Sequence, residues 1–221
     1  MKRIWRDNSL TIVMLGLFLL LLCGQAATGF FDYNSDQQEH QKQAIGFVEY
    51  LGSGHFIEGI FENWESEFLQ MGAYVLLTAF LFQKGSAESK DPDGEEPVDQ
   101  EPETQKDKAG APGPVRRGGA QLKIYKHSLS LALFALFAFS FALHAVGGAR
   151  EYSQEQKEHG GQEVSTLQYL GTSRFWYESL QNWQSEFLAV AALAVLSIWL
   201  REEGSPESKA VADSHEKTGS S

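Results

Sequence analysis

The chain has 221 residues, a formal net charge of −11 at pH 7 and a single cysteine. This length allows one sizeable domain or two small ones, and one cysteine excludes an intramolecular disulfide. The acidic balance argues against a nucleic-acid partner, because nucleic-acid binding needs a basic surface. Hydrophobic residues form 43% of the chain and gather in a few runs, which predicts an integral membrane protein with the lipid bilayer as its first partner.

Four apolar runs follow one another along the chain. A bilayer core of about 30 Å needs about 20 helical residues, and the first and third runs meet this length without any charged residue. The second and fourth runs reach it only when Trp64 and Trp183 are counted, and tryptophan favours the headgroup layer. The sequence therefore predicts an all-α fold with four transmembrane helices. The predicted spans are residues 10–28, 64–83, 128–147 and 183–201.

A cleaved signal peptide is the alternative for the first run, because the opening MKRIWR resembles a positively charged n-region. The apolar stretch is longer than the usual h-region of about 7–15 residues. Its counterpart at residues 128–147 lies in mid-chain, where no signal peptide occurs. Leu22 before Cys23 also argues against a lipoprotein. We therefore expect the first run to stay in the protein as a helix.

Nearly the same octapeptide occurs twice, as ENWESEFL at residues 62–69 and QNWQSEFL at residues 181–188. An offset of 119 positions also aligns GSAESK at residues 85–90 with GSPESK at residues 204–209. Of the 82 positions from Ser9 to Lys90, 29 are identical at this offset without a gap. The pattern predicts a tandem duplication, with a first repeat at residues 1–84 and a second at residues 123–203.

Each predicted repeat contains two spans, so both repeats enter the membrane from the same side. This arrangement predicts parallel repeats related by a pseudo-two-fold axis along the membrane normal, in contrast to inverted repeats. Basic residues are frequent before the first span and between the repeats, where residues 84–126 hold eight, and they are fewer in the two connections within the repeats. The positive-inside rule therefore predicts that both termini are cytoplasmic.

The segment at residues 85–122 is acidic, rich in proline and glycine, and lacks aromatic residues. Such a composition does not bury enough apolar surface to offset the entropy of ordering. We predict a disordered linker there and a disordered tail at residues 204–221. A solvated tether is the favoured role, and recruitment of a partner is the alternative.

The connection within each repeat has an aromatic face. Apolar residues with spacings of 4, 3 and 4 lie on one side of a helix, and Ser53 and Thr172 suit the N-cap position before it. The pattern predicts an amphipathic helix in the interface plane or packed against the other repeat. The face consists of Ile57, Phe61, Trp64 and Phe68 in the first repeat and of Trp176, Leu180, Trp183 and Phe187 in the second.

The polar residues of the octapeptide allow two interpretations. If a helix starts there, Asn63 is its N-cap and Glu67 lies at the positive end of the helix dipole. If the helix is continuous, Asn63 and Glu67 share a face, as do Asn182 and Glu186. The two glutamates could then meet at the repeat interface, and carboxylates at membrane depth often mark ion or proton paths. These four residues form the candidate polar site.

Other polar and aromatic residues have simpler interpretations. Tyr50 and Tyr169, like Trp64 and Trp183, are predicted interfacial anchors. His40 and His159 each follow a glutamate and could ligate a metal, but solvated loop residues are the favoured interpretation, so we expect no metal and no cofactor. A further pair, Gln25 and His144, is expected to bond a neighbouring helix.

Four stretches carry a resemblance to a known family: GQAATG (residues 24–29), YLGSGHF (50–56), ENWESEFLQMGAYVLLTAFL (62–81) and GSAESK. In them the chain resembles a bacterial family of uncharacterised membrane proteins that is described only as a domain of unknown function. The resemblance covers both repeats and implies a bacterial inner-membrane location but no activity. The second repeat departs from the pattern at His144, Gln181 and Gln184, where the first has Gln25, Glu62 and Glu65.

No enzyme motif accompanies these features. The chain has no phosphate-binding glycine loop, no nucleophile elbow, no CxxC pair and no HExxH spacing, so an enzymatic activity has no support. We favour a structural or interaction protein of the cell envelope, with a protein partner or a second copy of the chain. The alternative is a path for a small solute, ion or proton that uses Glu67 and Glu186.

Overall fold

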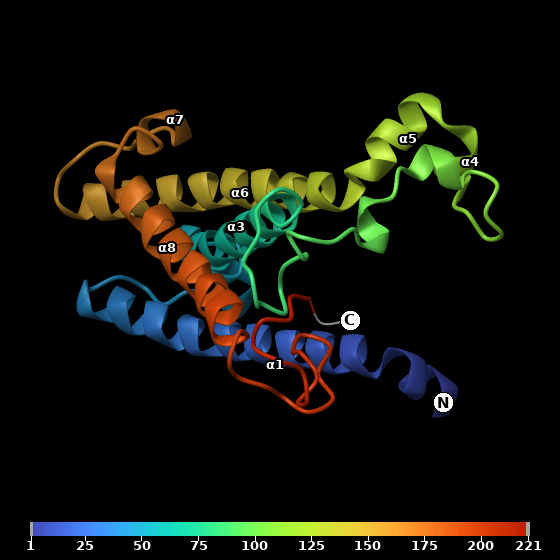
Figure 1. Ribbon diagram of the computed structural model, residues 1–221. Coiled ribbons are helices and arrows are strands. Elements are labelled where there is room, and N and C mark those ends of the chain that lie inside the picture. Colours follow the sequence, from blue (N-terminus) through green and yellow to red (C-terminus); the bar gives the residue numbers. More distant parts are fainter. Residues whose placement is uncertain (1, 220–221) are drawn as a thin grey trace. The chain divides into compact units, whose positions relative to one another are not determined.

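The computed structural model describes residues 2–219, so Met1 and the last two residues of the predicted tail lie outside it. Within this part every regular element is helical and no strand occurs (Figure 1). The α-helices are α1 (Lys2–Glu39), α2 (Phe47–Tyr50), α3 (Gly54–Leu77), α4 (Gly113–Arg117), α5 (Gly119–Lys126), α6 (Ser128–Glu158), α7 (Thr166–Tyr169) and α8 (Ser173–Leu196), and the 3-10 helices are η1 (Pro97–Asp99) and η2 (Pro102–Gln105). The all-α prediction is confirmed.

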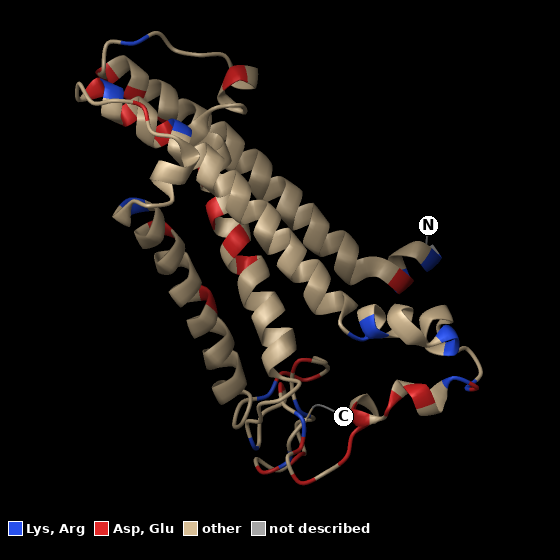
Figure 2. Ribbon diagram, turned by 90° about the horizontal axis from the view of Figure 1, so that it is seen from above, with Lys and Arg blue, Asp and Glu red and all other residues tan. Residues whose placement is uncertain are grey.

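Helices α1 and α6 are long and apolar enough to cross a membrane. With 38 and 31 residues and a rise of about 1.5 Å per residue, each exceeds a bilayer core of about 30 Å. The helix that starts at the N-terminus has no charged position along most of its length (Figure 2). Both helices continue past the predicted spans to Glu39 and Glu158, so the polar residues that follow each apolar run extend the helix.

Helices α3 and α8 start well before the octapeptides. The amide of Phe56 donates to Ser53 Oγ at 3.2 Å, and the amide of Phe175 donates to Thr172 Oγ1 at 3.3 Å. A side-chain oxygen that accepts from the third helical amide is an N-cap, so both predicted caps are confirmed.

Both octapeptides therefore lie inside continuous helices, and the prediction that Asn63 caps a new helix is wrong. The helices end at Leu77 and Leu196, before the predicted ends of the second and fourth spans. Tight turns follow, in which Phe80 N donates to Leu77 O and Trp199 N donates to Leu196 O.

The bounds of several elements recur at the offset of 119 positions that relates the octapeptides. Helices α3 and α8 start and end at equivalent positions, and so do α2 and α7. The ends of α1 and α6, Glu39 and Glu158, are equivalent as well. Equivalent sequences in the two halves thus adopt equivalent local structure.

The chain divides into two compact units that do not coincide with the predicted repeats. Unit 1 contains residues 1–61 and 142–175, and unit 2 contains residues 62–141 and 176–221. Each unit combines segments from both halves of the sequence.

Glycines allow close helix contacts in unit 1. A Cβ atom on Gly147 of α6 would lie 2.6 Å from Glu58 N, and one on Gly54 of α3 would lie 2.6 Å from Glu151 N. Tyr50 and Tyr169 pack against Gly29 and Gly148, where a Cβ atom would meet the Tyr50 hydroxyl at 2.2 Å and the Tyr169 ring at 2.4 Å. Small residues at helix crossings let backbones approach closely, so these glycines fix how the ends of α1, α3 and α6 pack within unit 1.

Unit 2 holds most of α3 and α8, the start of α6, the segment between α3 and α6 and the C-terminal segment. The loop after α3 is tied to the turn after α8 and to the C-terminal segment, because Ser86 Oγ lies 3.0 Å from Ser197 Oγ and the Gly219 amide donates to Ser86 O at 2.9 Å. The ammonium of the buried Lys209 donates to four backbone carbonyls, including that of Gly85. The disorder proposed for residues 85–122 and 204–221 stays a prediction.

Candidate functional site: a polar stripe on helix α3

The two octapeptides meet through polar side chains in unit 2. Asn182 Nδ2 of α8 donates a 2.6 Å hydrogen bond to Glu62 Oε1 of α3. One turn further along, Trp183 Nε1 donates to Glu65 Oε1 at 3.2 Å. The donors are residue types shared by both octapeptides, whereas the acceptors are the two positions where the first copy has glutamate and the second has glutamine. The contact between the two octapeptides is therefore asymmetric.

Burial makes Glu65 the most unusual member of this contact. Its side chain is completely buried, and its partner Trp183 is packed between Phe137 of α6 and Trp176 of α8, with ring centroids at 6.1 and 6.4 Å. Removing an ionised carboxylate from water is very unfavourable unless hydrogen bonds or nearby charge compensate. The site thus places an acid in an aromatic environment.

The acids begin a polar stripe along α3. Glu62, Ser66, Gln70 and Tyr74 follow one another at intervals of four residues, so they share one face of the helix. Ser66 and Gln70 are buried, with 1% and 6% of their surfaces exposed. From Glu62 to Tyr74 the stripe is about 18 Å long at about 1.5 Å per residue.

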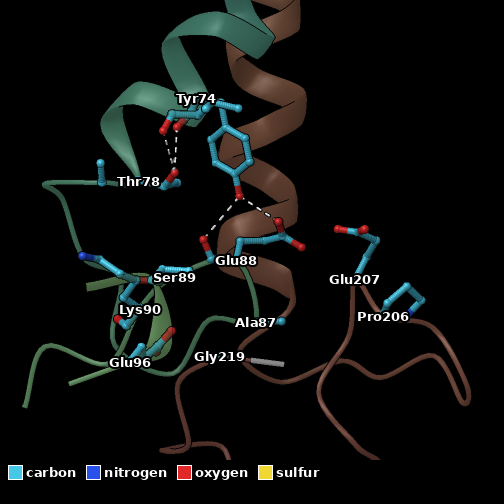
Figure 3. A pocket seen from close by; sticks show the side chains of 13 residues that line it. Tyr74, Thr78, Ala87, Glu88, Ser89, Lys90, Glu96, Pro206, Glu207 and Gly219 are labelled. Atoms are coloured by element: carbon cyan, nitrogen blue, oxygen red, sulfur yellow. Dashed lines mark hydrogen bonds between the residues drawn. The ribbon is translucent and has the colours of Figure 1, made fainter. Parts of the chain in front are cut away.

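At its far end the stripe reaches a carboxylate outside the helix. The hydroxyl of Tyr74 donates to Glu88 Oε2 at 2.8 Å (Figure 3). Glu88 belongs to the loop after α3, which Ser86 holds against the turn after α8. Buried or half-buried polar groups therefore run from the octapeptide contact to the end of the helix.

The structure separates the residues that we predicted as the polar site. Asn182 belongs to the octapeptide contact, but Asn63 is exposed. Glu67 is also exposed, and it lies close enough to Glu186 for the two charges to interact. Their participation in a path stays a prediction, and the buried acids beside them, Glu62 and Glu65, have the stronger geometry.

The two tyrosines predicted as interfacial anchors lie inside the protein, and their anchoring role stays a prediction. Tyr50 and Tyr169 are buried inside unit 1, with 2% and 0% of their surfaces exposed, because each fills the space over a glycine. Their hydroxyls have protein partners: Tyr50 Oη lies 3.3 Å from His55 Nδ1, and Tyr169 Oη donates to Glu58 Oε1 at 3.0 Å.

The two tryptophans predicted as anchors have different surroundings. Trp183 uses its indole N–H inside the protein, on Glu65, so it does not present that group to headgroups. Trp64 is half-buried, and its interfacial role stays a prediction.

The predicted histidine ligands lie near the ends of α1 and α6. His40 Nδ1 donates to Asp36 O at 3.0 Å, and His159 Nδ1 donates to Glu155 O at 2.9 Å. Each exposed imidazole ring thus bonds a backbone carbonyl near the end of its own helix. The hydrogen bond to the Asp36 carbonyl raises the pKa of His40. A weak metal site at these residues stays a prediction.

Gln25 and His144, the other equivalent pair, have different surroundings. Gln25 Nε2 donates to Gly59 O of α3 at 3.4 Å, as expected of a residue that bonds a neighbouring helix. His144 is completely buried and stacks on Phe175, with ring centroids 4.8 Å apart.

Unit 1 contains a titratable group of its own beyond the predicted third span. Burial raises the pKa of Glu151 to about 7, and the charge of Glu155 adds to this shift. Burial also lowers the pKa of His55, whose backbone amide donates to the Glu151 carboxylate. A group with a pKa near neutrality responds to small changes of pH.

Sequence reasoning missed most of the stripe. Gln70 and Tyr74 lie four residues apart within an otherwise apolar run, and Ser66 lies four residues before Gln70, so this spacing was a usable signal. Nothing in the sequence indicated that Glu62 and Glu65 meet Asn182 and Trp183, because these residues are about 120 positions apart.

The family described as Domain of unknown function (DUF6766) matches residues 1–220. The chain belongs to this family, which confirms the resemblance to a domain of unknown function. No curated protein and no solved structure matches the chain. The function must therefore be argued from the residues themselves.

Proposed function

We propose that this member of the family is a multi-pass membrane protein in which the polar stripe of α3 forms a path for protons or a small polar solute. Four helices, α1, α3, α6 and α8, cross a bacterial inner membrane as two parallel two-helix repeats, with both termini in the cytoplasm. The linker and the tail lie in the cytoplasm.

Local geometry supports the duplication on which this architecture depends. In the first half, Asn34 and Ile45 exchange two hydrogen bonds, at 3.1 and 2.8 Å. At the equivalent positions Ser153 and Val164 do the same, at 3.2 and 3.0 Å. Such agreement in side-chain detail, together with the equivalent helix bounds, is expected of a copied unit.

The observation that carries the proposed path is the completely buried carboxyl group of Glu65 at the head of a polar stripe. Ionisable groups within membrane helices are rare and usually serve ion or proton movement. Adhesion between α3 and α8 would not need an acid, because Asn182 and Trp183 need only a hydrogen-bond acceptor. A glutamine carbonyl provides one, and the second octapeptide has Gln181 and Gln184 at the equivalent positions.

Proton flux into liposomes that contain the full chain tests the path. The double variant Glu62→Gln, Glu65→Gln keeps both acceptors and removes both titratable groups, so we expect a stable protein without flux. The double variant Glu202→Gln, Glu203→Gln removes the same number of carboxylates at exposed positions and serves as the control, with unchanged flux. Flux that persists in the Glu62→Gln, Glu65→Gln variant, or wild-type flux equal to that of empty liposomes, would refute a proton path.

Membrane topology tests the architecture separately. Reporters inserted at Gln38 and Lys106 should lie on opposite sides of the membrane. A common side for both positions would rule out two parallel hairpins.

The exposed face of α8 favours a second candidate function, a structural or interaction protein of the envelope. Trp176, Leu180 and Phe187 of the predicted aromatic face are 43%, 54% and 39% exposed, and a large apolar surface contacts either lipid or a partner protein. Site-specific crosslinking from Leu180 in cells distinguishes the two. Crosslinks to a protein support the interaction role, whereas crosslinks to lipid alone argue against it.

A further inference from the structure

Two adjoining hollows occupy unit 2 where α3 and α8 end. The first has a volume of about 320 Å³ and mostly apolar walls, formed by Leu77, Phe82, Val190 and Ala194 among others. The second has a volume of about 580 Å³ and more polar walls. Small-molecule sites typically measure about 300–1,000 Å³, with apolar walls and a few placed polar groups, so the first hollow has the size and composition of such a site.

The carboxylate of Glu88 lies where the two hollows join, since it lines both. Its Oε2 accepts the hydrogen bond from Tyr74 (Figure 3). Its Oε1 is buried, and within the described part of the chain it has no hydrogen-bond partner. A buried carboxylate oxygen without a donor is unfavourable, so a cationic group in the hollow would supply the missing donor once the Glu88 side chain turns this oxygen toward it.

The charges around Glu88 favour a cationic ligand. Glu96 and Glu207 line the second hollow, where Lys90 is the one basic residue among the described lining. Lys90 forms an ion pair with Asp99, and its ammonium lies over the Phe82 ring at 5.6 Å. Its charge is thus already engaged, and no ion pair between Glu88 and a described basic residue is present.

We propose that the first hollow binds an organic cation with one short apolar tail, such as a primary alkylammonium ion. The ammonium group donates to Glu88 Oε1, and Tyr74 holds the other oxygen of the same carboxylate. The tail lies between the ends of α3 and α8, where Ala191 and Ala194 leave room that larger side chains would fill. An alkylammonium ion supplies a hydrogen-bond donor to Glu88 Oε1 and apolar contacts to the walls. An anion would be repelled by Glu88, Glu96 and Glu207.

Binding to the full chain in lipid nanodiscs tests this site, with hexylammonium as the probe and calorimetry as the readout. Hexanol and hexanoate have similar tails without the positive charge. We expect hexylammonium to bind at least about tenfold more tightly than hexanol, because hydrogen bonds to charged groups are the stronger class, and hexanoate not to bind. Glu88→Gln should weaken hexylammonium binding by about tenfold or more, and Glu203→Gln should leave it unchanged.

A second variant keeps the test decisive if Glu88→Gln does not fold. Ala194→Leu narrows the apolar part while retaining the carboxylate, and it should abolish the binding of both hexylammonium and hexanol. The inference is overturned if hexanol binds as tightly as hexylammonium, or if either variant binds hexylammonium like the wild type. The measurement needs no flux, so its failure leaves the proposed path of α3 untouched.

Discussion

The crossing of α3 and α6 at Gly147 makes a strong prediction about stability. A methyl group at residue 147 would lie 2.6 Å from Glu58 N and 3.1 Å from Glu58 Cα. Ordinary contacts of a Cβ atom are 3.4–4 Å, and a backbone atom does not rotate away as a side chain does. Gly147→Ala therefore has to push the two helices apart, and overpacking of this kind costs about 1–3 kcal/mol.

Gly24→Ala is the matched control, because Gly24 is also a helical glycine but has no described atom within 4 Å of its Cβ position. Both variants gain about 0.5–1 kcal/mol of helix propensity, so the difference between them isolates the steric clash. For a chain of this size 1 kcal/mol corresponds to about 2–4 °C in Tm. In detergent, the Tm of Gly147→Ala should therefore be about 2–12 °C below that of Gly24→Ala. A Tm equal to or above that of the control would refute the close crossing.

Two further predictions concern unit 1. Burial raises the pKa of Glu151 to about 7 from its ordinary value of 4.5. Between these two pH values the folded chain holds a proton on Glu151 that the unfolded chain releases. The contribution of Glu151 to the free energy of unfolding is therefore full below about pH 4.5 and falls as the pH rises to about 7. Melting curves between pH 5 and pH 8 should show this fall in the wild type and a smaller one in Glu151→Gln, and identical pH profiles would contradict the shift. Tyr169→Phe removes a hydrogen bond to the Glu58 carboxylate and should cost about 1.5–3 kcal/mol of unfolding free energy. Tyr50→Phe, which removes the longer bond to His55, should cost less in the same denaturation assay, and an equal loss would argue against a charged acceptor at Glu58.

Much of the local structure could be predicted from short stretches of sequence. The N-caps Ser53 and Thr172 and the apolar runs of α1 and α6 follow from side-chain chemistry within a few residues. The start of a helix at the octapeptide was predicted wrongly, since Asn63 has cap chemistry but follows a stretch that is already helical. A cap residue ends or starts a helix only where the flanking sequence does not continue it.

The candidate site was only partly predictable. The sequence directed attention to residues shared by the two octapeptides, Glu67 and Glu186, because repetition was the visible signal. The structure directs attention to Glu62 and Glu65, where the copies differ. What distinguishes these two acids is their hydrogen bonds to residues of α8. A contact between residues about 120 positions apart produces no periodic pattern in the sequence.

The sequence by itself determined that this protein is helical, where its long apolar helices lie and where α3 and α8 are capped, because periodicity and capping depend on neighbours within about four residues. Only the tertiary structure decided that Asn182 and Trp183 bond the acids of the first octapeptide, that Tyr50 and Tyr169 are buried over glycines, and that Glu88 lines the hollows at the ends of α3 and α8. These features depend on which helix faces meet, and that choice is made by close packing between segments far apart in the chain.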